Sequence, residues 1–255
     1  MSEKDFFIGW DEITPQENRR ALRRLLIPVF IGIPLLVLLL VAFVKPFNDH
    51  RFELGDVKEF SGTLFTTPFP VLVMDMDESP MGEETSALLV GYGKNGAKTF
   101  LKDPMGLDGH KVKIRGTLIY GDGKTLIELT EKENSLLSFD SETYSAEHGG
   151  SKSEVTLEGE ILDPKCWFGV MKPAEGKVHK SCAIRCVSGG IEPVLRVSDG
   201  AKNTYYVLKG MDGEDINQQI LEYFAEPIVV TAEVEERNGW RIAYINPNLI
   251  TYTSN

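Results

Sequence analysis

All three cysteines of the chain lie within one stretch of twenty-one residues, together with a histidine. The stretch begins at Cys166 and ends at Cys186, with His179 and Cys182 between them. Thiolates and imidazoles are ligands that zinc, copper and iron prefer in proteins. Because a chain of 255 residues could place its cysteines anywhere, their gathering in one segment indicates a shared task. We expect the specific chemistry of the protein to lie there.

The spacing of these residues matches one face of a helix. If residues 176–187 are helical, His179, Cys182 and Cys186 follow an i, i+3, i+7 pattern, which places them on the same side. Cys166 would lie on the loop that leaves a preceding strand and would supply a fourth ligand. Three cysteines and one histidine form a known closed zinc site, although the spacing is not that of a zinc ribbon. We therefore predict a metal site made of these four residues.

Copper is the alternative to zinc. Cys182 and Cys186 form a Cys-x-x-x-Cys pair, which resembles the paired cysteines of dinuclear copper electron-transfer sites and of thioredoxin-type copper-delivery proteins. Those families place a histidine after the pair, whereas His179 comes before it, so direct membership is not expected. Met171 is a possible additional ligand, because copper(I) favours soft thioether sulfur.

A disulfide is the competing interpretation of the same cysteines. Cys182 and Cys186 would be one helical turn apart and could approach disulfide distance with some strain, and disulfides persist in oxidising compartments. The pair could serve a thiol–disulfide oxidoreductase or have only a structural role. Covalent haem attachment is not expected, because Val187 stands where that motif requires a histidine.

No motif of a known catalytic class occurs in the chain. The sequence contains no Gly-x-Ser-x-Gly elbow, no phosphate-binding glycine loop and no His-Glu-x-x-His pattern. We therefore expect no nucleotide cofactor and name no catalytic residue; the sequence leans towards a non-enzymatic role. The formal net charge is −11, and since such a body repels phosphate backbones, nucleic acid is not an expected partner.

An apolar run near the N-terminus predicts a membrane anchor. Residues 25–44 include no charged side chain over twenty positions, and a helix of that length spans about 30 Å of bilayer hydrocarbon. Four arginines precede the run, so residues 1–24 should remain in the cytoplasm. A cleavable signal peptide would have a shorter core and a small-residue cleavage site. We expect a single-pass protein of the bacterial inner membrane whose bulk lies in the periplasm.

Two segments after the anchor share one pattern of short strands. Each contains a strand with a central glycine and later a hairpin, whose turn is Asp122-Gly123 in the first segment and Asn238-Gly239 in the second. These dipeptides suit two-residue turns between antiparallel strands. The order of elements resembles the OB-fold, a small five-stranded barrel.

The predicted fold is therefore mainly β. The transmembrane helix should be followed by two OB-like β-barrel domains, at residues 52–138 and 154–253, joined by a linker at 139–153. The second domain should carry the Cys/His segment, residues 164–193, with its short helix. A further short helix is expected at 215–224.

The Cys/His segment also resembles, as a whole, a signature of uncharacterised bacterial proteins with a single membrane anchor. It reads Cys-x-x-Gly-Val-Met-x-Pro from Cys166, and then Gly-Lys-x-His-x-x-Cys-Ala-x-x-Cys-x-x-Gly-Gly-Ile-x-Pro from Gly176 to Pro193. The resemblance implies no activity. Anchor, barrels and ligand cluster together lead to the hypothesis of a metal-binding accessory protein or subunit of a membrane redox or respiratory complex, with other membrane proteins as partners. The alternatives are the oxidoreductase and a non-catalytic interaction scaffold with a structural disulfide.

Overall fold

The computed structural model divides the chain into two units, residues 1–48 and 49–255. It describes residues 16–43, 50–75, 85–101, 104–130, 132–145, 149–200 and 202–253. Most of the expected cytoplasmic segment, residues 1–15, lies outside this part of the chain.

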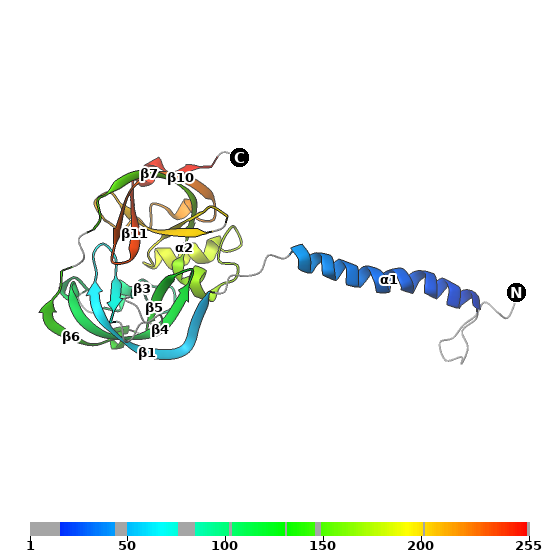
Figure 1. Ribbon diagram of the computed structural model, residues 1–255, viewed down its shortest axis with the longest axis horizontal. Coiled ribbons are helices and arrows are strands. Elements are labelled where there is room, and N and C mark those ends of the chain that lie inside the picture. Colours follow the sequence, from blue (N-terminus) through cyan, green and yellow to red (C-terminus); the bar gives the residue numbers. More distant parts are fainter. Residues whose placement is uncertain are drawn as a thin grey trace. The chain divides into compact units, whose positions relative to one another are not determined.

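The first unit contains one helix, α1, Gln16–Phe43 (Figure 1). The most apolar 18 residues of the stretch Asn18–Phe43 have a mean hydropathy of 3.0 and none of them is buried, and the stretch is long and apolar enough to cross a membrane. The helix starts before the predicted apolar run, because the arginine-rich residues ahead of that run are good helix formers. The apolar helix is confirmed, while the membrane it crosses and its direction stay predictions.

The second unit begins with a closed five-stranded barrel. Strand β1 pairs with β2, β2 with β3, β3 with β5, β5 with β4, and β4 closes the ring on β1. The β3–β5 pair is parallel and the others are antiparallel. The strands are β1 Arg51–Phe65, β2 Val71–Met74, β3 Thr85–Val90, β4 His110–Gly121 and β5 Lys124–Leu129. Two short 3₁₀ turns, Ala97–Thr99 and Pro104–Leu107, lie between β3 and β4.

A second barrel repeats this order. Its strands are β7 Ser153–Leu162, β8 Val194–Ser198, β9 Asn203–Gly210, β10 Pro227–Arg237 and β11 Trp240–Ile245. The ring runs β7-β8-β9-β11-β10 and closes on β7, and its β9–β11 pair is parallel, like the β3–β5 pair of the first barrel. The two-residue strand β12, Thr251–Tyr252, adds to β10. The predicted architecture of two OB-like barrels is confirmed.

Both predicted hairpin turns are present. Asp122 and Gly123 have φ angles of 48° and 68°, and Asn238 and Gly239 have φ angles of 49° and 70°. Positive φ at both central positions is the type I′ geometry that matches the twist of the flanking strands. The turns join β4 to β5 and β10 to β11 with two-residue loops.

Two local predictions differ from the structure. Residues up to Thr143 of the expected linker belong to strand β6, Leu136–Thr143, which pairs with β4 outside the barrel ring. Its residues are mostly exposed, so no buried face imposes an apolar pattern on the sequence. The expected helix at 215–224 is a series of turns that ends in a 3₁₀ turn, Leu221–Tyr223. Its apolar spacing instead buries Ile216, Ile220 and Phe224 in the barrel core.

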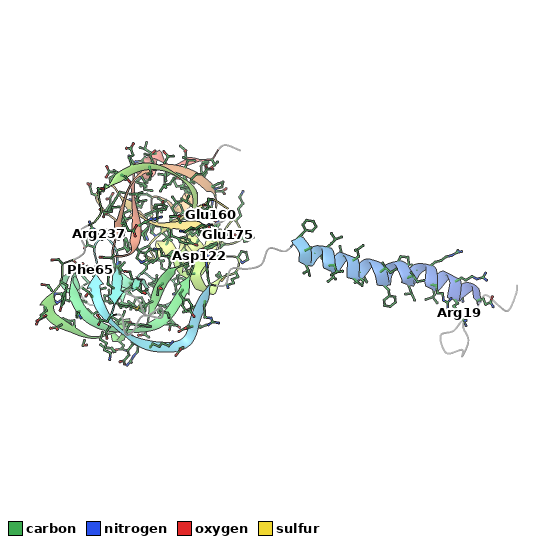
Figure 2. The ribbon with its side chains drawn as sticks, in the orientation of Figure 1. Arg19, Phe65, Asp122, Glu160, Glu175 and Arg237 are labelled. Atoms are coloured by element: carbon green, nitrogen blue, oxygen red, sulfur yellow. The ribbon has the colours of Figure 1, made fainter. Side chains whose placement is uncertain are left out.

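One hydrophobic cluster runs through both barrels. The first barrel contributes Val71, Leu88 and Ile119, among others, and the second contributes Trp167 and Trp240. Polar contacts cross the same boundary: the carboxylate of Asp122, labelled in Figure 2, accepts hydrogen bonds from the side chains of Asn203 and Tyr205. The barrels are therefore packed as one body, which allows a site to use residues from both.

The central glycines of the first strands are required by close backbone approach. A Cβ at Gly62 would overlap the carbonyl oxygen of Val73, and a Cβ at Gly159 would overlap that of Arg196. We predict that Gly62→Ala and Gly159→Ala each lower the free energy of unfolding by about 1–3 kcal/mol, the usual cost of overpacking. Urea unfolding of the full chain in detergent, followed by tryptophan fluorescence, measures this.

The matched control for these variants is Gly150→Ala. A Cβ at Gly150 would meet only the Glu236 carbonyl oxygen, at 3.9 Å, which is ordinary contact. Equal stability of all three variants would show that the strand glycines are not sterically required.

Candidate metal centre

The Cys/His segment forms the connection between β7 and β8, the first two strands of the second barrel. Directly after β7 comes Asp163, followed by a π-helical turn, Cys166–Val170. Helix α2, Lys180–Ser188, follows, and in Figure 1 it lies between the strands of the two barrels. The predicted helix thus starts later than residue 176, because Gly176 has a φ of 66°, a conformation outside a right-handed helix.

Helix α2 and the π-helical turn bring the predicted ligands together. His179 is the N-cap residue of α2, and its carbonyl oxygen accepts the backbone N–H of Cys182 at 2.9 Å. The Sγ atoms of Cys166 and Cys182 are 4.0 Å apart, and the ligand atoms of Cys166, His179 and Cys182 lie within 4.8 Å of one another. Cys186 lies within the same distance of Cys166 and of a residue the sequence reasoning missed, Asp163.

The separation of the sulfurs suits a metal better than a bond between them. All three cysteines are free thiols, and a disulfide would require an Sγ–Sγ distance of about 2.05 Å. Two thiolates on a tetrahedral zinc ion, each at about 2.3 Å, are about 3.8 Å apart. The 4.0 Å between Cys166 and Cys182 is close to that spacing.

Two polar atoms of the cluster are buried without a hydrogen bond. Within the described residues, neither Nε2 of His179 nor Oδ2 of Asp163 has a hydrogen-bond partner. The exposed fractions of these residues are only 3% and 0%. Leaving a buried polar group unsatisfied costs about 1–3 kcal/mol. Both residues also offer a ligand atom within 4.8 Å of cysteine sulfurs, as expected for ligands of a metal ion.

The first barrel adds a cation to the cluster. Lys94 lies in the connection that follows β3, and its Nζ donates to Sγ of Cys182 at 2.9 Å and to Sγ of Cys186 at 3.6 Å. Its ammonium group is placed to stabilise negative charge on the sulfurs. Because Lys94 is exposed, it also stands between the cluster and solvent.

Glycine packing determines where Lys94 lies. The backbone N–H of Gly96 donates to the carbonyl oxygen of Gly189, at the end of α2, at 2.8 Å. A Cβ at Gly189 would overlap the carbonyl oxygen of Lys94, and a Cβ at Gly96 would overlap that of Gly190. Only glycine lets the two backbones approach this closely, so these residues place the first barrel's lysine against the second barrel's cysteines.

Burial and hydrogen bonding shift the pKa values of three side chains in the cluster, those of Cys166, His179 and Lys94. A hydrogen bond with Cys186, together with burial, raises the pKa of the Cys166 thiol well above its ordinary range. Burial lowers the pKa of His179, and Lys94 adds to that effect while Asp163 opposes it. The hydrogen bond to Cys182 raises the pKa of Lys94. His179 is therefore held as a neutral imidazole, the form that binds metals, while Cys166 must release a proton when it does so.

The remaining candidate, Met171, is 39% exposed at the C-terminal end of the π-helical turn. Its part as a ligand stays a prediction. Asp163 was missed although a signal existed, since it precedes Cys166 by three residues, the spacing of one helical turn. Lys94 carried no sequence signal, because it comes from the other barrel.

No protein-family model, curated protein or solved structure matches the chain.

The buried imidazole gives the metal-free protein a specific pH dependence. His179 has a lowered pKa when folded and an ordinary value of 6.5 when unfolded, so the unfolded state binds its proton first. Stability should then fall as the pH drops below about 6.5 and stay level above it, as far as this group is concerned. We predict that His179→Gln removes this component, measured by urea unfolding in chelator between about pH 8 and pH 5.

The matched control is His110→Gln, which changes a histidine outside the cluster. If the pH dependence of His179→Gln equals that of the unaltered protein and of this control, the imidazole is not held neutral by its surroundings.

Proposed function

We propose that this protein is a membrane-anchored, periplasmic accessory protein or subunit of a membrane redox or respiratory complex that binds zinc or copper through its Cys/His cluster. One observation carries the metal-binding part. A ring nitrogen of His179 lies within 4.8 Å of the sulfurs of Cys166 and Cys182, and the buried Nε2 of this imidazole has no hydrogen-bond partner in the described structure.

Zinc fits this set better than copper. An imidazole nitrogen and cysteine sulfurs are the usual ligands of zinc, and a carboxylate, that of Asp163, stands within reach of two of the sulfurs. Copper(I) would favour sulfur alone, which would leave the imidazole and the carboxylate unused. When bound, the ion would act as a structural link between the π-helical turn after β7 and helix α2.

The closed surroundings support a binding role rather than turnover. Cys166, His179 and Cys186 are 6%, 3% and 2% exposed. A site that closed suits a resident ion, since catalytic zinc sites keep a position open for water or substrate.

The membrane part of the proposal rests on α1. The helix has the length and hydropathy of a membrane span, and Arg19, Arg20, Arg23 and Arg24 stand at its N-terminal end. Positive charge on that side favours a cytoplasmic N-terminus. The barrels and their cysteines would then lie in the periplasm, beside the other subunits of a membrane complex.

A thiol–disulfide oxidoreductase is the second candidate. The 4.0 Å between the Sγ atoms of Cys166 and Cys182 would close to a bond after a small movement, and Cys182 is the least buried of the three cysteines. This distance favours Cys166 and Cys182 as the redox-active pair, whereas the sequence suggested Cys182 and Cys186.

Metal and thiol analysis of the full chain, purified in detergent, separates the candidates. We predict bound metal, predominantly zinc, whose amount falls in Cys182→Ser and in His179→Gln, because each variant removes a ligand of the group Cys166, His179 and Cys182. Met171→Leu is the control for copper, because zinc binding should not change when this thioether is removed.

Other outcomes would contradict the metal proposal. Absence of metal with a reversible two-thiol titration would favour the oxidoreductase. Absence of metal with a disulfide that survives mild reductant would leave the interaction scaffold.

A further inference from the structure

The ligand atoms of the cluster form two groups rather than one. The first group is Cys166, His179 and Cys182, and the second is Asp163, Cys166 and Cys186. Within each group every ligand atom lies within 4.8 Å of the others. Cys166 belongs to both, so its sulfur stands between two sets of ligands.

One oxygen of the buried Asp163 carboxylate caps the start of the π-helical turn. Its Oδ1 accepts the backbone N–H of Lys165 at 3.0 Å and that of Cys166 at 3.4 Å, which fixes the carboxylate at the start of the π-helical turn. Its Oδ2 is buried and lacks a hydrogen-bond partner in the described part of the chain. The same carboxylate has an oxygen within 4.8 Å of the sulfurs of Cys166 and Cys186, and a buried charge of this kind requires a cation or a proton.

The nearest lysine in sequence does not supply that cation. The ammonium group of Lys165 donates to the carboxylate of Glu128 at 2.6 Å and to the carbonyl oxygens of Gly91 and Gly93 at 2.8 and 2.6 Å. All three acceptors belong to the first barrel. Lys94 donates to the sulfurs of Cys182 and Cys186, and no such bond joins it to Asp163 among the described contacts.

We propose that the cluster holds two divalent ions bridged by the thiolate of Cys166. Cys166, His179 and Cys182 would bind one ion, and Asp163, Cys166 and Cys186 the other. A thiolate has enough lone pairs to bind two ions, and zinc accepts sulfur, imidazole nitrogen and carboxylate oxygen alike. This inference rests on the proposed metal binding and deepens it, because it assigns Asp163 as a ligand and sets the number of ions.

Charge balance is consistent with two ions. Three thiolates and one carboxylate carry four negative charges, which two divalent cations neutralise in a buried site. One ion would leave two of these groups to be neutralised by protons or by Lys94. The ammonium of Lys94 remains in contact with solvent, where its charge is hydrated.

Cobalt(II) is the probe for the test, because it occupies zinc sites and is visible in absorption and electron paramagnetic resonance spectra. The full chain in detergent is freed of metal under reducing conditions and titrated with Co2+. We expect two ions per chain. The paramagnetic signal per ion should fall as the second ion binds, since a bridging thiolate couples the two spins.

Two variants assign the ions. Asp163→Asn keeps the size and one carbonyl acceptor but weakens the second position, so it should bind one Co2+ at concentrations that saturate the unaltered protein, with full signal per ion. His179→Gln should likewise retain one ion. Glu160→Gln, which changes a partly buried carboxylate bonded to the Gly176 N–H, is the control and should bind two.

Each result bears on a different claim. One ion per chain in the unaltered protein would overturn the two-ion proposal and leave the proposed function standing, whereas no ion would overturn both. Two ions without spin coupling would contradict the Cys166 bridge. Two ions in folded Asp163→Asn, checked by its melting curve, would remove Asp163 from the ligand set.

Discussion

Close backbone contact between the two barrels is the constraint on which the site depends. Gly96 of the first barrel donates its N–H to the Gly189 carbonyl oxygen at the end of α2. Side chains on Gly96 or Gly189 would overlap the facing backbone. This contact holds Lys94 over the sulfurs of Cys182 and Cys186. The cysteines of the second barrel thus receive a neighbouring positive charge from a lysine of the first barrel.

The shared boundary explains why two small barrels act as one support. A five-stranded barrel of fewer than 100 residues buries a limited core, and here each barrel extends its core across the boundary through one hydrophobic cluster. The buried ion pair between Lys165 and Glu128, at 2.6 Å, lies at that boundary. Such a pair is costly to break once it is buried. The π-helical turn that holds Cys166 is therefore joined to the first barrel through Lys165 as well as to the second barrel through β7.

The sequence predicts this fold well where local rules apply. Asp122-Gly123 and Asn238-Gly239 identify the hairpins because few dipeptides accept positive φ at both positions, and the apolar run identifies α1 through its length. Two predictions were wrong: part of strand β6 was predicted to be linker, and the turns near Ile216 were predicted to be a helix. In both places the tertiary environment overrides local preference. The environment is an exposed edge for β6 and the barrel core for the turns. The candidate site divides in the same way. Cys166, His179, Cys182 and Cys186 share one segment and could be found by spacing, whereas Lys94 is brought to them only by tertiary packing.

The central claim is that cysteine sulfur and histidine nitrogen of this segment bind a metal ion together. X-ray absorption at the zinc edge of the zinc-loaded full chain tests it most directly. The account predicts sulfur scatterers at about 2.3 Å together with nitrogen or oxygen scatterers at about 2.0–2.1 Å, with the sulfur contribution reduced in Cys182→Ser. A spectrum that contains only nitrogen and oxygen neighbours, unchanged in that variant, would contradict it.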